Sequence, residues 1–346
     1  DHHGHLMPES PRSVLRNQLA KLEAMGMQAL VGTELEFIVF EDSYEEAWDR
    51  RYMGLTPVNQ YNVDYSIVGT SRVEPLLRRL RLSMKNAGLT VESVKGECNF
   101  GQHELAFKYK DALTTCDNHS VYKTAAKEIA HLNGRSITFM AKPDFADTGS
   151  SCHIHSSLWS LDGRTAVFDD HHAPHGMSDT FRHYLAGLVA TAREFSLLWA
   201  PTINSYKRFQ LGSWAPTGVG WGIDNRTLGF RKVGHGKGTR VECRIPGSDA
   251  NSYFVFAGAI AGGLHGIRNK MELGEPFKGN GYETDEIPRI PWNIVDAIDL
   301  WEGSRIAREA FGDDVHHHVL TAAKAEWAAF NQTVTDWEMR RYFERI

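Results

Sequence analysis

The segment Thr33-Glu34-Leu35-Glu36-Phe37-Ile38-Val39-Phe40 decides how this chain folds and where its chemistry lies. It is rich in β-branched and aromatic residues, which favours a strand. Side chains alternate between the two faces of a strand, so Glu34 and Glu36 project from one face and Leu35 from the other. Two neighbouring carboxylates repel each other unless a cation lies between them. The segment therefore predicts a strand with one apolar face and one face that binds a divalent metal.

The same alternation of polar and apolar residues recurs in three further segments, at 151–158, 240–245 and 96–104. A single polar strand face is usually solvated surface, but four such faces backed by apolar residues indicate one shared site. The polar side chains are His153, His155 and Ser157 in the first segment, Arg240, Glu242 and Arg244 in the second, and Glu97 and Glu104 in the third.

The composition is that of a globular protein with an ordinary hydrophobic core. The chain has 346 residues, 42% hydrophobic and 23% charged, which suffices for one large domain or two ordinary ones. Its formal net charge of −5 gives no reason to expect nucleic acid or an anionic membrane as a partner. The sequence has no apolar run of about 18 residues that would cross a membrane, and we recognise no signal peptide.

The four cysteines form no CxxC pair. We therefore expect free thiols in a reducing compartment, the cytoplasm, rather than disulfides or a zinc site. Cys98, Cys152 and Cys243 each adjoin a polar residue of a predicted strand, so we expect their side chains to face away from the site.

Predicted helices and strands alternate along the chain without strict βαβ order and without a phosphate-binding glycine loop. The pattern predicts an α+β fold with a mainly antiparallel sheet. We expect residues 1–9 to form a flexible N-terminal segment, and 41–70 and 201–239 to form loops. The expected helices span about 11–25, 72–87, 119–132, 178–195 and 252–268, with further helices to the C-terminus, and the expected strands span 34–40, 90–98, 103–108, 136–140, 151–158 and 240–245.

Six side chains on these strands are candidate metal ligands. Five carboxylates and one imidazole suit two hard dications, Mg²⁺ or Mn²⁺, better than zinc. A polyphosphate bound beside them would need additional cations, and arginine suits phosphate because its planar group makes two-point contacts. Metals and arginines around a triphosphate indicate phosphoryl transfer. The ligands are Glu34, Glu36, Glu97, Glu104, His153 and Glu242, and the arginines are Arg208, Arg226, Arg231, Arg240 and Arg244.

The order of these motifs resembles the catalytic domain of glutamine synthetases. The resemblance runs from about Pro11 to the C-terminus and implies a domain over 10–346, with a curved antiparallel half-barrel surrounded by helices. It also implies that ATP phosphorylates the side chain of L-glutamate and that an amine then attacks the γ-glutamyl phosphate. The matching segments are 34–36, 101–104, 142–143 leading to 153–158, 204–208, 225–226 and 240–244.

The resemblance also implies roles for individual residues. One metal would lie on the glutamate side, bound by Glu36, Glu97 and Glu104. A second would lie at the ATP phosphates, bound by Glu34, His153 and Glu242. The catalytic arginines would be Arg208, Arg226 and Arg231, the last two nearest the transferred group. The ATP contacts would be Tyr109, His155, Ser157, Arg231 and Arg240, and the glutamate contacts would be Arg208, Arg244 and the backbone of Gly149.

Two positions depart from the pattern of ammonia-using relatives. Those proteins carry a glutamate in a flap where this chain has Trp214, and a usual asparagine is replaced by Thr148. An indole cannot accept a proton from ammonium, but it can wall a pocket for an alkyl chain. In this respect the chain is similar to γ-glutamylamide synthetases that act on polyamines, ethanolamine or other alkylamines. We therefore assign Trp214 to the amine pocket.

We expect no counterpart of the family's small N-terminal β-grasp domain in these 346 residues. In the family that domain completes the site of a neighbouring subunit, so we expect this chain alone to be a weak or inactive catalyst. The resemblance implies that the full-length protein forms homo-oligomeric rings, which we expect to be dodecamers. We expect neither nucleic acid nor a membrane as a partner. Two alternatives stay open: an ordinary glutamine synthetase that uses ammonia, and an inactive family member with a structural or regulatory role.

Overall fold

The structure, a computed structural model, describes residues 2–346, and Asp1 of the segment expected to be flexible lies outside them. A nine-stranded sheet forms its centre, in the order β2-β3-β1-β6-β9-β8-β7, with β4 and β5 also paired to β1. The β7–β8 pair is parallel, and the other pairs are antiparallel. The predicted α+β fold is thus confirmed. The strands are β1 Met27–Phe40, β2 Val91–Gly96, β3 Gln102–Phe107, β4 Lys110–Asp111, β5 Ser136–Thr138, β6 Cys152–Ser160, β7 Trp221–Ile223, β8 Phe230–Val233 and β9 Arg240–Cys243.

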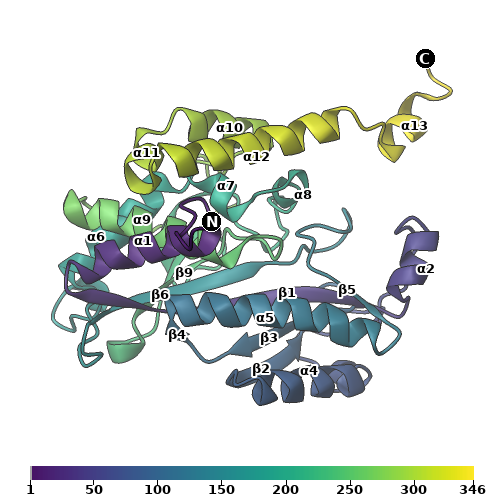
Figure 1. The fold of residues 1–346 in the computed structure, drawn as a ribbon, viewed down its shortest axis with the longest axis horizontal. Helices are drawn as coiled ribbons and strands as arrows, with labels where there is room; N and C mark the ends of the chain where they lie inside the picture. The colour runs from purple at the N-terminus through teal and green to yellow at the C-terminus, as the bar shows by residue number, and fades with distance from the viewer. Residues whose placement is uncertain (1) are drawn as a thin grey trace.

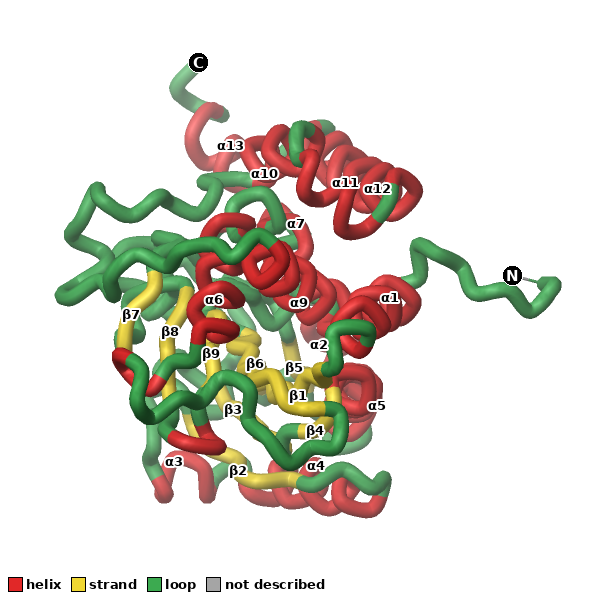
Figure 2. Tube along the Cα trace, turned by 90° about the vertical axis from the view of Figure 1, so that its left-hand side faces the viewer, coloured by secondary structure: helices red, strands yellow, loops and turns green. Residues whose placement is uncertain are grey.

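Strand β1 brings the distant motifs together. It pairs with β3 on one side and with β6 on the other, so segments about 70 and 120 residues downstream become its neighbours. In these registers Glu36 lies opposite Glu104, and Glu34 lies opposite His153. Figure 2 shows the strands following one another as a curved surface.

The apolar face of β1 forms part of the hydrophobic core. Leu35 and Phe37 are fully buried, and the ring of Phe37 contacts Tyr122 of α5 edge-on at 6.5 Å between centroids. Helix α5 therefore covers this face, with α1 and α9 beside it (Figure 1). The carboxylates of β1 are left on the opposite face.

Helices α10 to α12 form an outer layer over α7 and α9, and α13 lies at the C-terminal end of the chain (Figure 1). None of the helices in residues 2–346 is long and apolar enough to cross a membrane. The helices are α1 Pro11–Glu23, α2 Tyr44–Asp49, α3 Ile67–Ser71, α4 Glu74–Asn86, α5 Ala112–His131, α6 Asp179–Thr191, α7 Ser196–Trp199, α8 Ile203–Tyr206, α9 Ser252–Arg268, α10 Ile294–Glu302, α11 Arg305–Phe311, α12 Asp313–Asn331 and α13 Asp336–Tyr342.

Two segments expected to be loops contain regular structure. Within 41–70, α2 begins at a capping box in which Ser43 and Glu46 bond each other's backbone N–H groups. Residues 201–239 contain α8, β7 and β8, which are only three or four residues long. Elements of that length give too few periods to stand out in a sequence rich in glycine and proline. Helix α5 also begins earlier than expected, because Asp111 caps it.

Candidate active site

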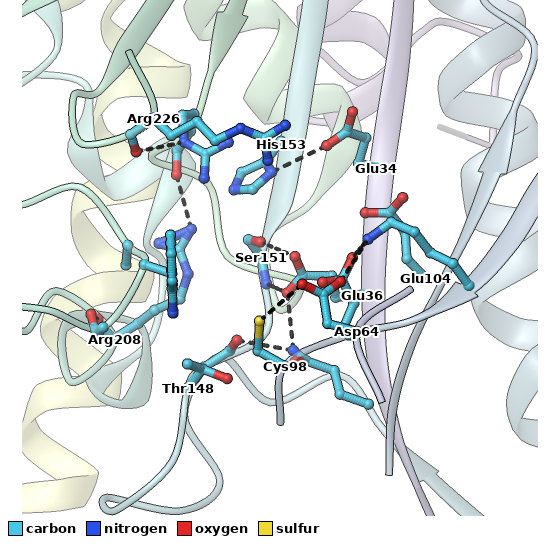
Figure 3. A pocket seen from close by; sticks show the side chains of 18 of the residues that line it. Glu34, Glu36, Asp64, Cys98, Glu104, Thr148, Ser151, His153, Arg208 and Arg226 are labelled. Atoms are coloured by element: carbon cyan, nitrogen blue, oxygen red, sulfur yellow. Dashed lines mark hydrogen bonds and ion pairs between the residues drawn. The ribbon is translucent and has the colours of Figure 1, made fainter. Parts of the chain in front are cut away.

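The polar face of the sheet opens on one cavity, and all six predicted metal ligands line it. The arginines Arg208, Arg226, Arg231 and Arg244 line the same cavity, together with Gly149 and Trp214. Figure 3 shows carboxylates from β1 and β3 on one side and arginines on the other. The structure therefore brings together residues that are up to about 200 positions apart in the sequence.

Glu36, Glu97 and Glu104 form the first cluster, and each offers a carboxylate oxygen within 4.8 Å of the others. Burial, and then the charge of Glu97, raises the pKa of Glu36 to about 7. Burial and the neighbouring carboxylates raise the pKa of Glu104 well above its usual range. Glu36 and Glu104 are buried and Glu97 is partly buried. Three carboxyl groups that oppose one another's ionisation fit a hard dication, which would stabilise all three charges.

The Glu36 carboxylate is held in one orientation by hydrogen bonds. Ser151 donates from its backbone N at 2.7 Å and from its Oγ at 2.6 Å, and Gln102 Nε2 donates at 3.0 Å. Such outer contacts orient a metal ligand and limit its motion. The role of Ser151 was not anticipated from the sequence, because a neutral serine next to a strand carries no specific signal.

The second cluster lies around Glu34. His153 Nδ1 is 3.2 Å from one Glu34 oxygen and 3.6 Å from Glu242, and His155 Nε2 is 2.9 Å from the other Glu34 oxygen. Glu34, His155 and Glu242 each offer a ligand atom within 4.8 Å of the others. His155 is therefore a candidate ligand beside His153, in addition to its predicted place on the nucleotide side.

Glu242 is almost fully buried between two arginines. Arg231 Nη1 lies 2.8 Å from one carboxylate oxygen and Arg244 Nη1 lies 2.6 Å from the other. Burial opposes ionisation, but His153 and Arg244 hold the pKa of Glu242 at about 2. Asp224 also holds the Arg231 guanidinium, because Asp224 Oδ1 accepts a hydrogen bond from Arg231 Nε at 2.9 Å. A metal bound here would share Glu242 with these guanidinium groups.

Lys95 and Cys98 belong to the cavity but were not predicted as part of it. Lys95 lies opposite Glu104 in the sheet, and its ammonium group bonds Glu97. The expectation that Cys98 faces away from the site is wrong, because it lines the cavity. Strand β2 ends at Gly96, so the alternation of faces does not continue to Cys98. The four cysteines are free, as expected.

The wall expected to bind glutamate is closely packed. Arg208 is only 2% exposed, and its terminal nitrogens donate to the carbonyls of Arg244, Ile245 and Pro246 at 2.9 to 3.1 Å. A Cβ on Gly149 would lie 2.3 Å from the Ala141 carbonyl oxygen and 2.9 Å from Arg208 Cγ. Glycine is therefore required for the close approach at this point.

A second cavity adjoins the first and is lined by the other predicted ATP contacts. Tyr109, His155, Ser157 and Arg240 lie on its walls, and Glu34 lines both cavities. Arg240 Nε donates to His155 Nδ1 at 3.1 Å. The two cavities thus meet at Glu34, where the polar faces of β1 and β6 adjoin.

Comparison with known proteins places the chain in a family. Residues 8–342 match the family described as glutamine synthetase, catalytic domain. This chain belongs to the glutamine synthetase family. Enzymes of this family use ATP and divalent metals, which agrees with the carboxylate and histidine clusters. The predicted resemblance is thus confirmed.

Two relatives within this family carry names that specify an amine. The γ-glutamylethanolamide synthetase GlnA4 of Streptomyces coelicolor is 58% identical over 337 residues, which cover 97% of this chain and 72% of that protein. The glutamate–isopropylamine ligase of a Pseudomonas species is 36% identical over 340 residues, covering 97% and 74%. A solved GmaS/ADP complex matches with a TM-score of 0.88 and 28% identity, over 98% of this chain and 78% of that one.

Trp214, which the sequence analysis assigned to the amine pocket, lies in the cavity. Trp214 lines it from the loop after α8 and is 62% exposed. Its backbone has a φ of 63°, in the left-handed region that few non-glycine residues adopt. Such strain is characteristic of functional positions.

Proposed function

We propose that this protein is an ATP-dependent ligase that joins L-glutamate to a short primary alkylamine and forms a γ-glutamyl amide. The observation that carries the proposal is that Trp214 lines the cavity of the candidate metal ligands, in the place of the flap glutamate of ammonia-using relatives. The names of the ethanolamide synthetase and the isopropylamine ligase support an alkylamine over ammonia. Both names denote small monoamines, which favours these over long polyamines.

ATP occupies the second cavity in this proposal. Tyr109 stacks on the adenine, and Ser157, His155 and Arg240 line the path of the ribose and phosphates. Because Glu34 borders both cavities, the terminal phosphate reaches the carboxylate cavity at that point. Aromatic side chains bind bases by stacking, and arginines bind phosphate oxygens in pairs.

The two carboxylate clusters are the proposed sites of Mg²⁺ or Mn²⁺. Glu36, Glu97 and Glu104 would hold one ion on the glutamate side. Glu34, His153 and Glu242 would hold another at the phosphates, with His155 as a further candidate ligand. When bound, these ions neutralise negative charge on the phosphate and carboxylate oxygens. The oxygen-rich ligand set fits these hard ions.

Glutamate lies along the wall formed by Arg208, Arg244 and the backbone of Gly149. A γ-carboxylate oxygen forms a bond to the terminal phosphorus of ATP, and the bond between that phosphorus and the ADP oxygen breaks. Arg226 and Arg231 stabilise the charge on the phosphoryl group as it moves. Arg231 suits this role because Asp224 and Glu242 hold its guanidinium from two sides.

The amine completes the reaction. Its neutral nitrogen attacks the γ-carbonyl carbon of γ-glutamyl phosphate and the bond from that carbon to the phosphate oxygen breaks. The nitrogen loses one proton as the amide forms, and the departing phosphate takes it up. Trp214 covers the alkyl group and keeps water from the acyl phosphate. In the intact enzyme, glutamate labelled with heavy oxygen in its γ-carboxyl group should transfer that label to inorganic phosphate during amide formation. Phosphate without the label would contradict the acyl-phosphate route.

We further propose that residues 10–346 act as one catalytic domain within a homo-oligomeric ring, a dodecamer in the full-length protein, located in the cytoplasm. Membership of the family supports the assembly. The four free cysteines support a reducing compartment. Sedimentation of the full-length protein would measure the assembly, and a monomer at working concentration would contradict it.

A further inference from the structure

The cavity contains one carboxylate that the reaction described above does not use. Asp64 lies just before α3, in a segment expected to be a loop, and it lines the cavity that also holds Trp214 and the candidate metal ligands. Figure 3 shows it beside the glutamates, in contact with Cys98. The proposed function leaves open which group attracts the amine, and Asp64 is in the right cavity to do so.

The backbone around Asp64 is firmly positioned. The preceding Val63 is fully buried, and a Cβ on Gly96 would lie only 2.4 Å from the Val63 carbonyl oxygen. The segment therefore packs directly on the end of β2. The backbone N of Asp64 donates to Asn62 Oδ1 at 2.9 Å, and the next residue, Tyr65, has a φ of 54°. These contacts turn the chain so that the carboxylate enters the cavity.

The Asp64 carboxylate retains capacity to accept hydrogen bonds. Its Oδ2 accepts from Cys98 Sγ at 3.5 Å, whereas its Oδ1 is shielded from solvent and has no hydrogen-bond partner among residues 2–346. The Lys95 ammonium is 3.9 Å from Oδ1, but it bonds Glu97 and lies over the Tyr65 ring at 4.6 Å. A buried acceptor without a donor is costly, so a bound donor would satisfy it.

Charge and shape point to the kind of donor. Asp64 adds a negative charge to a cavity wall that already contains Glu97 and Glu104, with Lys95 as the cation beside them. Trp214 offers the same cavity an apolar face that attracts alkyl groups and cations. A ligand that meets both features has a positive nitrogen and a short alkyl chain.

We propose that Asp64 binds the ammonium group of the incoming amine and so determines the preference for cationic amines. This inference rests on the proposed function, because it assumes that the amine enters beside Trp214. Asp64 accepts a charge-assisted hydrogen bond from the ammonium, which holds the nitrogen near the γ-carboxyl group of glutamate. The ammonium gives one proton to solvent water before the resulting neutral nitrogen attacks the acyl phosphate. Trp214 then selects the alkyl part, and Asp64 selects the charged part.

The test compares cationic and neutral nucleophiles in the full-length enzyme. Asp64→Asn keeps the size of the side chain and removes its charge, and Asp64→Glu keeps the charge. We expect Asp64→Asn to raise KM for ethanolamine by about tenfold or more, with a smaller change in kcat. Hydroxylamine is uncharged at neutral pH, so its KM should stay within about twofold of wild type. Asp64→Glu should keep much of the wild-type affinity for ethanolamine. Asp299→Asn removes an exposed carboxylate of α10 and should leave the KM values for ethanolamine and hydroxylamine unchanged.

Other roles of Asp64 would give different results. If Asp64 were a metal ligand, the midpoint for Mn²⁺ binding would shift together with turnover. If Asp64 only paired with Lys95, Asp64→Asn would change the KM values for ethanolamine, hydroxylamine and ATP by similar factors. Either result, or an unchanged KM for ethanolamine, would overturn the inference. The amine preference of the wild-type enzyme tests the proposed function separately, and a preference for ammonium would contradict that function. The effect of Asp64→Asn can be measured in either case, because ammonium is also a cation.

Discussion

Glu36 on β1 lies directly opposite Glu104 on β3, and both side chains are less than 8% exposed. Like charges at opposed positions destabilise a sheet, and burial increases that cost. The pair nevertheless lies on two interior strands of the sheet, and Ser151 and Gln102 orient Glu36. This arrangement lowers the stability of the folded chain unless a cation binds between the carboxylates.

The first prediction concerns metal and thermal stability. Mn²⁺ should raise Tm of the protein, because an ion that binds only the folded state at a hundred times its Kd stabilises it by about 2.7 kcal/mol. Glu104→Gln should abolish the part of this shift that comes from the first cluster, Glu36, Glu97 and Glu104. Without metal the same variant should be as stable as wild type or more stable, because it replaces a buried carboxyl group whose ionisation burial and its neighbours oppose.

Differential scanning calorimetry with and without Mn²⁺ measures both effects. The exposed Asp299→Asn serves as the control and should keep the full response to metal. A Glu104→Gln protein with the same metal-dependent shift as wild type would contradict the assignment of the first cluster.

A second prediction concerns the close approach at Gly149. Gly149→Ala should lower the free energy of unfolding by about 1–3 kcal/mol, because the new methyl group must displace the Ala141 carbonyl or Arg208. The KM for glutamate should rise as well. Gly274→Ala is a matched control, since a Cβ there meets nothing within 4 Å. Urea denaturation that found the two variants equally stable would show that the packing at Gly149 is less strict than described.

A third prediction concerns the nucleotide cavity. Tyr109 is 53% exposed on its wall, so its ring is free to contact a base. Stacking of a base on an aromatic ring contributes about 1–3 kcal/mol, so Tyr109→Ala should weaken ADP binding about tenfold or more. Tyr109→Phe keeps the ring and should bind ADP almost as well as wild type. Calorimetric titration would refute the stacking role if both variants bound ADP equally.

The fold class and the cavity could be predicted from sequence because alternation in a strand reports which residues share a face. Glu34 and Glu36 are such a pair, and the structure places them in one cavity. The sequence does not report register or the fold of irregular segments, which depend on tertiary packing. Asp64 was therefore missed in a segment expected to be loop, and Cys98 was placed on the wrong side of a strand that ends before it. Lys95 and Glu97 are two residues apart, but β2 ends between them at Gly96, so strand alternation does not predict their contact.

A fourth prediction concerns the amine pocket. The Trp214 indole can bury about 100 Å² of alkyl surface, which at about 25 cal/mol per Å² contributes roughly 2.5 kcal/mol. Trp214→Glu in the intact enzyme should therefore raise KM for the alkylamine by up to about two decades. Use of ammonium should increase, because the new carboxylate can accept a proton from it. A variant that kept wild-type selectivity would show that Trp214 does not face the amine.

The most direct test of the account is the rate of ADP formation by wild-type full-length enzyme with ATP, glutamate and Mg²⁺ in the presence of separate nucleophiles. The panel comprises ammonium, ethanolamine, isopropylamine and a polyamine at equal concentrations. We predict the highest kcat/KM for a short alkylamine, with the γ-glutamyl amide formed in equal amount to ADP. Faster turnover with ammonium than with every amine would contradict the account and identify the protein as an ordinary glutamine synthetase.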